Sequence, residues 1–92
     1  MMVQVELFGL ARLLAGAPRL EVSLPDDATL RDIVPALAGL CPALVGVALL
    51  RDLSGLESGY TFSLNGRSFV ADLETRLAPD DAVLLLPAAG GG

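Results

Sequence analysis

The sequence predicts an α+β fold, in which a mixed sheet of four to five strands packs on one main helix. Three observations lead to this prediction. Five short segments alternate in polarity or are short apolar runs bounded by turns, as strands do. One longer segment repeats apolar residues at helical spacing. Gly, Pro, Asn and Asp stand between these segments, where the chain must turn. Ninety-two residues suffice for one domain with a modest core.

The first two strands are expected at residues 3–8 and 19–24. In the first strand, every second residue from Val3 onward faces one side of the sheet, and Phe8 faces the opposite side. The second alternates in the same way. A short apolar connection over residues 11–16 joins them, so the two strands are predicted to form a hairpin.

The main helix is expected to begin after Thr29 and to end near Cys41. Thr29 with Asp32 three residues later resembles a capping box, with Asp in place of the usual Glu. Pro35 falls early in the segment, where it is expected to bend the first turns or shift the helix start, and Pro42 lies just beyond the end. The apolar residues at helical spacing are Leu30, Ile33, Val34, Leu37 and Leu40.

A second hairpin is expected after this helix. Residues 43–50 are predicted to form another short helical piece, and residues 51–59 a loop. Strands at residues 60–64 and 67–70 flank Asn65-Gly66, whose two residues both tolerate the positive φ that a type I′ turn requires.

The final strand is expected at residues 82–86, after a connection over residues 72–77 with at most one turn of helix. Pro87 stops it. Asp80 and Asp81 precede it in a turn; they serve that turn or meet arginines of a partner. Strand alternation then predicts that Val83 and Leu85 face the helix and that Leu84 and Leu86 face outward.

Composition limits the partners that this chain can bind. Eleven acidic residues against six arginines give a net charge of -5, which disfavours nucleic acid and suggests partners with basic docking surfaces. The hydrophobic fraction is 53%, and the mean hydropathy of +0.64 is high for a small domain. Some apolar surface is therefore expected to remain for a partner.

The residues that usually carry catalysis or bind metals are scarce. There is no histidine and no metal-ligand spacing, so no metal site and no general base are expected. Cys41 is the single cysteine and cannot form an internal disulfide, which fits a reducing, cytoplasmic compartment. It is expected to be a buried structural thiol. No signal peptide is visible.

One uncharged run raises the alternative of a membrane span. Residues 33–50 are 18 residues without a charge, which is long enough by length alone. Pro35, Gly39, Pro42 and Gly46 interrupt the run and divide it into pieces too short to span. No membrane association is therefore expected.

The chain ends in three consecutive glycines, Gly90, Gly91 and Gly92. They carry no Cβ and have little conformational preference, so they add nothing to a packed structure. They suit a chain end that threads through a narrow slot into another protein's active site. The hypothesis is that the Gly92 carboxylate is the functional group; the alternative is an unstructured end or a cloning remnant without a role.

Nearly the whole chain resembles the MoaD/ThiS sulfur carriers, ubiquitin-like proteins of the β-grasp fold. The element Arg12-Leu13-Leu14-Ala15-Gly16 is most similar to the small subunit of molybdopterin synthase. Segment 44–59 is the least similar part. The stretches that carry the resemblance are VELFGLARLLAGAP, SLPDDATLRDIVPALAGLCPAL, FSLNGRS, LAPDDAVLLLP and the glycine end.

The resemblance implies a β-grasp domain at residues 1–87 and a flexible tail at residues 88–92. Family members commonly end in an apolar residue, Pro, two small residues, Ser or Ala, and then Gly-Gly. Gly90 stands where Ser or Ala is usual. The matching residues here are Leu86, Pro87, Ala88, Ala89, Gly90, Gly91 and Gly92.

The resemblance also implies the chemistry and the partners. An adenylyltransferase partner uses ATP and Mg²⁺ to adenylate the last glycine, and a sulfur donor then converts the adenylate to a thiocarboxylate. The chain itself binds no cofactor and is not catalytic alone; it is the sulfur-donating subunit of a sulfurtransferase complex. The sulfur acceptor is an enzyme such as the large subunit of molybdopterin synthase. The reactive residue is Gly92, with Gly91 beside it.

An apolar docking patch of Phe8, Leu84 and Leu86 is implied for these partners, and Pro87, Ala88, Ala89 and Gly90 enter their active sites with the tail. The alternative is that these apolar side chains only pack under a loop. Three other functions stay open: a carrier for thiazole, cysteine or a secondary metabolite, a protein modifier that joins Gly92 to lysines, and a binding module whose tail is inert.

Overall fold

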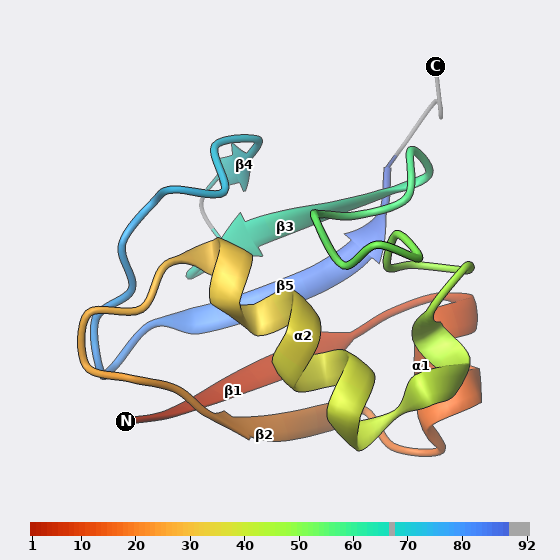
Figure 1. The fold of residues 1–92 in the computed structure, drawn as a ribbon, viewed down its shortest axis with the longest axis horizontal. Coiled ribbons are helices and arrows are strands. Elements are labelled where there is room, and N and C mark those ends of the chain that lie inside the picture. Colours follow the sequence, from red (N-terminus) through yellow and green to blue (C-terminus); the bar gives the residue numbers. More distant parts are fainter. Residues whose placement is uncertain (67, 89–92) are drawn as a thin grey trace.

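The computed structural model describes residues 1–66 and 68–88. One main helix packs against a mixed sheet, as predicted, and Figure 1 shows their arrangement. The elements within the described ranges are β1 Met2–Leu7, α1 Leu10–Ala15, β2 Arg19–Ser23, α2 Leu30–Leu40, a 3₁₀ turn at Pro42–Leu44 (η1), β3 Tyr60–Leu64, β4 Ser68–Val70 and β5 Ala82–Pro87.

The sheet places the first and last strands side by side at its centre. The strand order is β2-β1-β5-β3-β4. Strands β1 and β5 are parallel, with Val5 opposite Val83 and Leu7 opposite Leu85, and all other neighbours are antiparallel. The chain therefore ends its last strand in the middle of the sheet.

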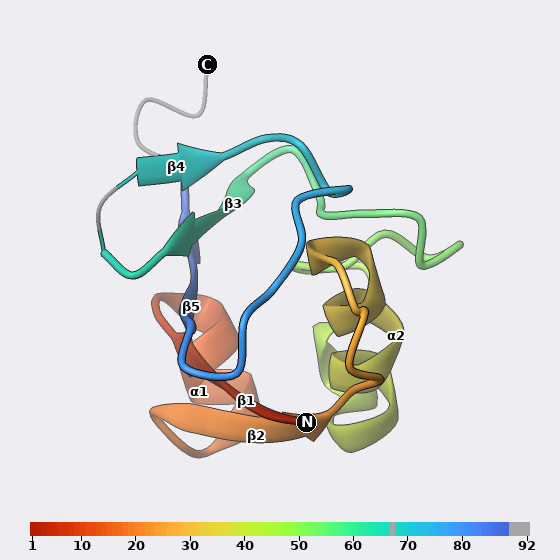
Figure 2. The ribbon, with the colours of Figure 1, turned by 90° about the vertical axis from the view of Figure 1, so that its left-hand side faces the viewer.

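The core lies between α2 and one face of the sheet, as Figure 2 shows from the end of the sheet. Alternation along β5 puts Val83 and Leu85 on this face, where they are 1% and 0% exposed. Phe62 of β3 lies opposite Leu85 and is also fully buried. The helix contributes Leu30, Ile33, Val34 and Leu37, all fully buried.

The predicted start of the main helix is correct. A capping box is present at Thr29, whose backbone N–H donates to the Asp32 carboxylate at 2.9 Å. Pro35 lies inside α2, in its second turn, and does not move the start of the helix. In the described ranges no helix has both the length and the apolarity to cross a membrane.

The Asn65-Gly66 turn has the predicted backbone conformation, but Leu64 lies opposite Ser68, one residue further along than a two-residue loop would place its partner. Asn65 and Gly66 have φ of +57° and +66°, as a type I′ turn requires. The Asn65 side chain accepts a hydrogen bond from the Ala82 N–H at 2.9 Å and donates one to Asp81 at 3.0 Å. This turn is thereby tied to the start of β5.

Three local predictions were wrong or incomplete. The connection at residues 11–16 contains the short helix α1, which ends at Gly16 in the left-handed conformation. The predicted helical piece at residues 43–50 is only the 3₁₀ turn η1, after which Gly46 has a φ of +87°. Residues 72–77 form a turn without a helix and bridge to Thr29. Tertiary contacts, not local periodicity, decide these segments.

The expected burial of Cys41 was wrong as well. Cys41 ends α2 as its C-cap residue and is half-buried, with its Sγ 3.8 Å from the Leu14 carbonyl oxygen of α1. A residue at the end of a helix faces the edge of the core, so the apolar pattern of α2 does not extend to it.

Candidate functional site

The outward side of β5 carries apolar side chains, as predicted from strand alternation. Leu84 lies opposite Glu6 of β1 and Ser63 of β3, and Leu86 lies opposite Thr61. Both leucines are half-buried, although no helix of the core covers this face. Two leucines on the open side of a central strand leave apolar surface exposed to water.

Phe8 lies beside this strand. Strand β1 ends at Leu7, one residue earlier than expected, and the Phe8 N–H donates to the Leu85 carbonyl oxygen at 3.1 Å. Its side chain is half-buried. Because Leu7 faces the core, Phe8 follows on the side of the sheet that Leu84 and Leu86 occupy. The structure therefore brings the backbone of Phe8 next to the two predicted leucines.

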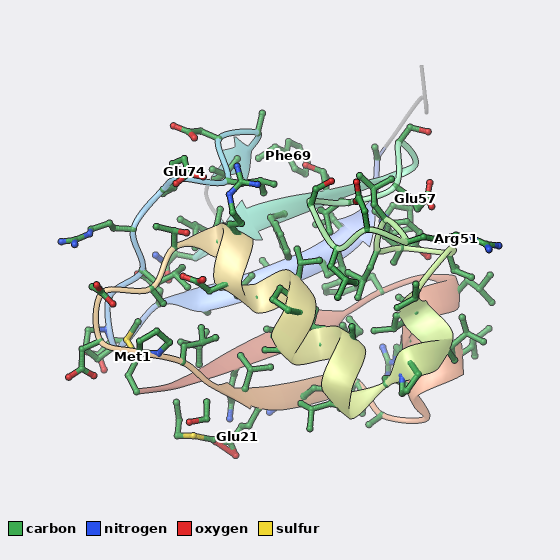
Figure 3. All side chains as sticks on the ribbon, viewed as in Figure 1. Met1, Glu21, Arg51, Glu57, Phe69 and Glu74 are labelled. Carbon is green, nitrogen blue, oxygen red and sulfur yellow. The ribbon has the colours of Figure 1, made fainter. Side chains whose placement is uncertain are left out.

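The structure adds one residue that the sequence prediction did not name. Phe69 of β4 lies opposite Ser63, which in turn lies opposite Leu84. Its side chain is 69% exposed, and Figure 3 shows it at the β4 side of the molecule. Ser63 is 5% exposed between its two apolar neighbours. Alternation after Asn65-Gly66 indicates that Phe69 and Val70 face opposite sides of the sheet, but it does not indicate which of them faces outward.

These four residues, Phe8, Leu84, Leu86 and Phe69, are called the outer-face patch below. The part of the same sheet face over β1 and β2 is polar. There Glu6 lies opposite Arg19, and Gln4 opposite Glu21. The outer face is thus apolar over β5 and β4 and charged over β1 and β2.

Asp81 serves the turn before β5. Its carboxylate accepts hydrogen bonds from the Ala78 N–H at 2.8 Å and from the Asn65 side chain at 3.0 Å. These bonds hold the turn that starts the strand. The turn interpretation of this residue is confirmed.

The end of β5 is held by the loop before β3. Pro87 is exposed and lies opposite Tyr60 at the first position of that strand. The Ala88 N–H donates to the Gly59 carbonyl oxygen at 2.8 Å. Four residues of the predicted site, Ala89, Gly90, Gly91 and Gly92, lie outside the described residues.

The titratable groups give no sign of a catalytic centre in the described part of the chain. No group of three or more His, Cys, Asp or Glu residues there is placed to hold a metal ion. The Ser54 hydroxyl, at 2.6 Å, and its backbone N–H, at 3.0 Å, donate to Asp52 and lower the pKa of that carboxyl below its usual range. This exposed carboxylate caps its own loop.

Comparisons with known proteins agree on the family and the fold. A model of the ThiS family matches residues 5–92. None of the curated proteins matches the chain. Among solved structures, SAMP1 from Haloferax volcanii is 29% identical over all of both chains, with a TM-score of 0.83.

Two further solved structures are similar. A putative molybdopterin converting factor, subunit 1, from Pyrococcus furiosus is 25% identical over 97% of this chain and 99% of that one, with a TM-score of 0.74. The BexX/CysO complex of Amycolatopsis orientalis contains a chain that is 20% identical over 98% and 99%, with a TM-score of 0.73, and supports the fold alone. The β-grasp prediction is confirmed, and the chain belongs to the ThiS family of ubiquitin-like sulfur carriers.

Proposed function

We propose that the Gly92 carboxylate is the reactive group of this protein and carries sulfur as a thiocarboxylate. The observation that carries the proposal is that the ThiS family match continues through Gly92, the last of three consecutive glycines. The residues that follow Ala88 are the part of the chain that enters the active sites of partners. Glycines suit this task because no side chain obstructs a narrow channel.

The chemistry takes place on two partners. A carboxylate is a poor electrophile and must be activated first. An adenylyltransferase that uses ATP and Mg²⁺ lets a Gly92 carboxylate oxygen attack the α-phosphorus of ATP, with loss of pyrophosphate. A sulfide-level donor, hydrosulfide, then attacks the acyl carbon through its sulfur, AMP leaves with the electron pair of the broken C–O bond, and loss of the sulfur-bound proton leaves the thiocarboxylate. The thiocarboxylate is a soft nucleophile that transfers its sulfur to an acceptor on a second enzyme.

Molybdenum cofactor synthesis is the proposed destination of the sulfur, with the chain as the small subunit of molybdopterin synthase. The likeness to the putative molybdopterin converting factor subunit of P. furiosus supports this choice, as does the element at residues 12–16. The thiocarboxylate would enter the large subunit, which turns a pterin precursor into a dithiolene. The carrier fold places few constraints on the acceptor, so thiazole, cysteine or secondary-metabolite pathways are the alternative destinations.

The outer-face patch is the proposed docking surface for both partners. Its side chains are apolar and at least partly exposed on strands that a sheet holds rigid, which suits an interface core. The net charge of -5 favours partners with a basic rim around that core. A reducing, cytoplasmic location is proposed from the single Cys41.

An intact-mass experiment tests the reaction. The full chain is incubated with ATP, Mg²⁺, the activating enzyme and a sulfur donor. The expected result is a mass gain equal to the exchange of one oxygen for sulfur, lost when Gly92 is deleted. Gly91→Val should block the gain because a β-branched side chain fills the channel, while its melting temperature stays that of the wild type. An unchanged mass with a competent enzyme would refute the proposal.

A protein modifier is the second candidate, and the likeness to small archaeal modifier protein 1 favours it. Here the activated Gly92 would pass to a lysine of a target. The chain has no lysine, so it cannot form chains through its own side chains. The same experiment in a cell lysate separates the two functions: a modifier gives high-mass conjugates that resist thiols, and a sulfur carrier does not.

A further inference from the structure

We propose that Gly9 is a positioning residue for the C-terminal end: it lets Pro87 pack closely and thereby fixes the backbone at Ala88, the residue from which the glycine end continues. This inference rests on the proposed function of Gly92. The contacts of Pro87 and Ala88 with Gly9, Gly59 and Tyr60 are called the strand-end clamp.

The contact between Gly9 and Pro87 leaves no room for a side chain. A Cβ built on Gly9 would lie 2.6 Å from Cγ and 3.3 Å from Cδ of Pro87, and 3.7 Å from the Tyr60 hydroxyl. Real Cβ atoms do not approach a ring carbon so closely, and the proline ring is stiff, so the end of β5 would have to move. The packing of Pro87 therefore depends on glycine at position 9.

The backbone of Gly9 also requires glycine. Its φ of +66° and ψ of -145° lie in a region that residues with a Cβ rarely adopt. This conformation turns the chain from β1 into α1 at the point where Pro87 passes. Gly16 at the other end of α1 also has a positive φ, +69°, but a Cβ there would meet nothing within 4 Å. The two glycines differ in their contact with β5.

Tyr60 holds α1 in place against the clamp. Its hydroxyl oxygen accepts a hydrogen bond at 3.1 Å from the Ala11 N–H, one of the free donors in the first turn of α1. The helix has no side-chain cap at Gly9 itself. Tyr60, which is 49 positions away from Ala11 in the sequence, therefore supplies the missing acceptor. Tyr60 also lies opposite Pro87 in the sheet.

Gly59 completes the clamp from the other side. Its carbonyl oxygen accepts the hydrogen bond from Ala88, one residue beyond β5, at 2.8 Å. In Figure 1 the loop before β3 lies next to the end of β5. Pro87 and Ala88 thus contact two segments that are distant in sequence, one at Gly9 and one at Gly59 and Tyr60. Fixing Ala88 shortens the part of the tail that must be ordered inside a partner's active site, which lowers the entropy lost on entry.

The outer-face patch and the clamp are therefore expected to affect different kinetic constants in the reaction with the adenylyltransferase. The outer-face patch determines binding and therefore KM, whereas the clamp determines the alignment of the chain end and therefore kcat. Misplacing a reacting group by about 1 Å can lower a rate by on the order of a hundredfold. A change at Gly9 should lower kcat for adenylation by about tenfold or more and leave KM little changed.

The test compares Gly9→Ala with Gly16→Ala, which introduces a methyl group at a positive φ without the contact to Pro87. The first readout is amide hydrogen exchange of Ala88 in the full chain without a partner. The second is kcat and KM for ATP-dependent adenylation by the enzyme that activates the wild type. Gly9→Ala should speed the exchange and lower kcat, and Gly16→Ala should change neither beyond its effect on global stability.

The double variant Gly9→Ala/Pro87→Ala separates contact from backbone strain. It removes the Pro87 Cγ but keeps the strain at position 9, so exchange and kcat should return toward the values of Pro87→Ala alone. A double variant as impaired as Gly9→Ala would overturn the proposal. If Gly9→Ala does not fold, Tyr60→Phe, which removes only the hydroxyl that holds Ala11, should produce the same two effects more weakly, and wild-type values for both would overturn the proposal.

The two proposals fail in different ways. If the wild-type chain forms no adenylate with a competent enzyme, the proposed function fails, and hydrogen exchange at Ala88 still decides whether Gly9 fixes the strand end. If adenylation proceeds and Gly9→Ala matches the wild type in both exchange and kcat, the clamp proposal is wrong and the proposed function stands.

Discussion

The two sides of strand β5 are made of the same kinds of residue but lie in different surroundings. Val83 and Leu85 face α2 and are 1% and 0% exposed, whereas Leu84 and Leu86 face outward and are only half-buried. The first pair stabilises the fold, because their apolar surface is removed from water when the chain folds. The second pair gains little from folding. The proposed docking of a partner accounts for its apolar character, so stability and partner binding should respond to different substitutions.

The largest effect is expected for the inner side. Leu85→Ala should lower the free energy of unfolding by about 2–5 kcal/mol, because it leaves a cavity between α2 and the sheet. Leu84→Ala makes the same chemical change one residue away and should lower it by less than about 1 kcal/mol. Denaturant unfolding of both variants measures the difference. Equal losses would mean that the two sides of β5 do not differ as the structure indicates.

The opposite pattern is expected for partner affinity. Leu84→Ser combined with Leu86→Ser should weaken binding to the adenylyltransferase by about tenfold or more, because central apolar residues contribute most to an interface. Gln4→Ser, on the polar part of the same sheet face, is the matched control and should change little. Isothermal titration calorimetry measures both. Wild-type affinity in the double variant would remove the outer-face patch as the docking surface.

Phe69 sharpens the comparison by testing how far the patch extends. Phe69→Ala should weaken the same interaction by about fivefold, roughly 1 kcal/mol, with little change in melting temperature, because this side chain is already exposed. Met2→Ala is a suitable control, since Met2 is 53% exposed on β1. If both variants bind like the wild type, the patch ends at β5.

A smaller effect is expected at the start of the helix that covers the inner side. Asp32→Ala removes the carboxylate that accepts the Thr29 N–H and should lower the free energy of unfolding by about 0.5–2 kcal/mol. Chemical denaturation is the measurement. Partner affinity should not change, because α2 lies on the other side of the sheet from the patch. A loss of affinity at full stability would contradict this separation.

The smallest effect is expected at Asp52. Ser54 hydrogen bonds lower its pKa in the folded state, so the stabilisation exists above the unfolded pKa of about 3.9 and is lost as the pH falls through the folded pKa. In Ser54→Ala the carboxyl should titrate at a higher pH than in the wild type. An NMR titration of the Asp52 carboxyl carbon measures the midpoint, and identical midpoints would show that the Ser54 hydroxyl does not lower the pKa of this group.

The two sides of β5 also illustrate how much of the fold the sequence alone could predict. Alternation in β1, the short apolar run of β5, the helical spacing from Leu30 and the Asn65-Gly66 turn predicted the sheet and the main helix, and the period of two along a strand predicted the side on which each leucine of β5 lies. These signals are local, and local signals decide long periodic elements. The helix α1 was missed because six residues carry too little periodicity, and its first turn depends on Tyr60, which is distant in sequence.

The candidate site was predictable only in part. Phe8, Leu84 and Leu86 followed from strand alternation and the family resemblance. Phe69 required the register of β4 against β3, because a two-residue loop at Asn65-Gly66 would set Phe69 opposite Phe62, whereas the structure sets it opposite Ser63. The close approach of Pro87 to Gly9 was also out of reach, because it depends on how the ends of β1 and β5 meet. Register and tertiary contact, which local patterns leave open, account for both omissions.

The central claim is that Gly92 is the reactive end and that the folded body presents it to an activating enzyme. ATP–pyrophosphate exchange, catalysed by that enzyme in the presence of the carrier, measures formation of the acyl-adenylate directly. The account predicts exchange with the full chain and none with a chain that lacks Gly92, although both fold equally well. Equal exchange with the two chains would contradict it.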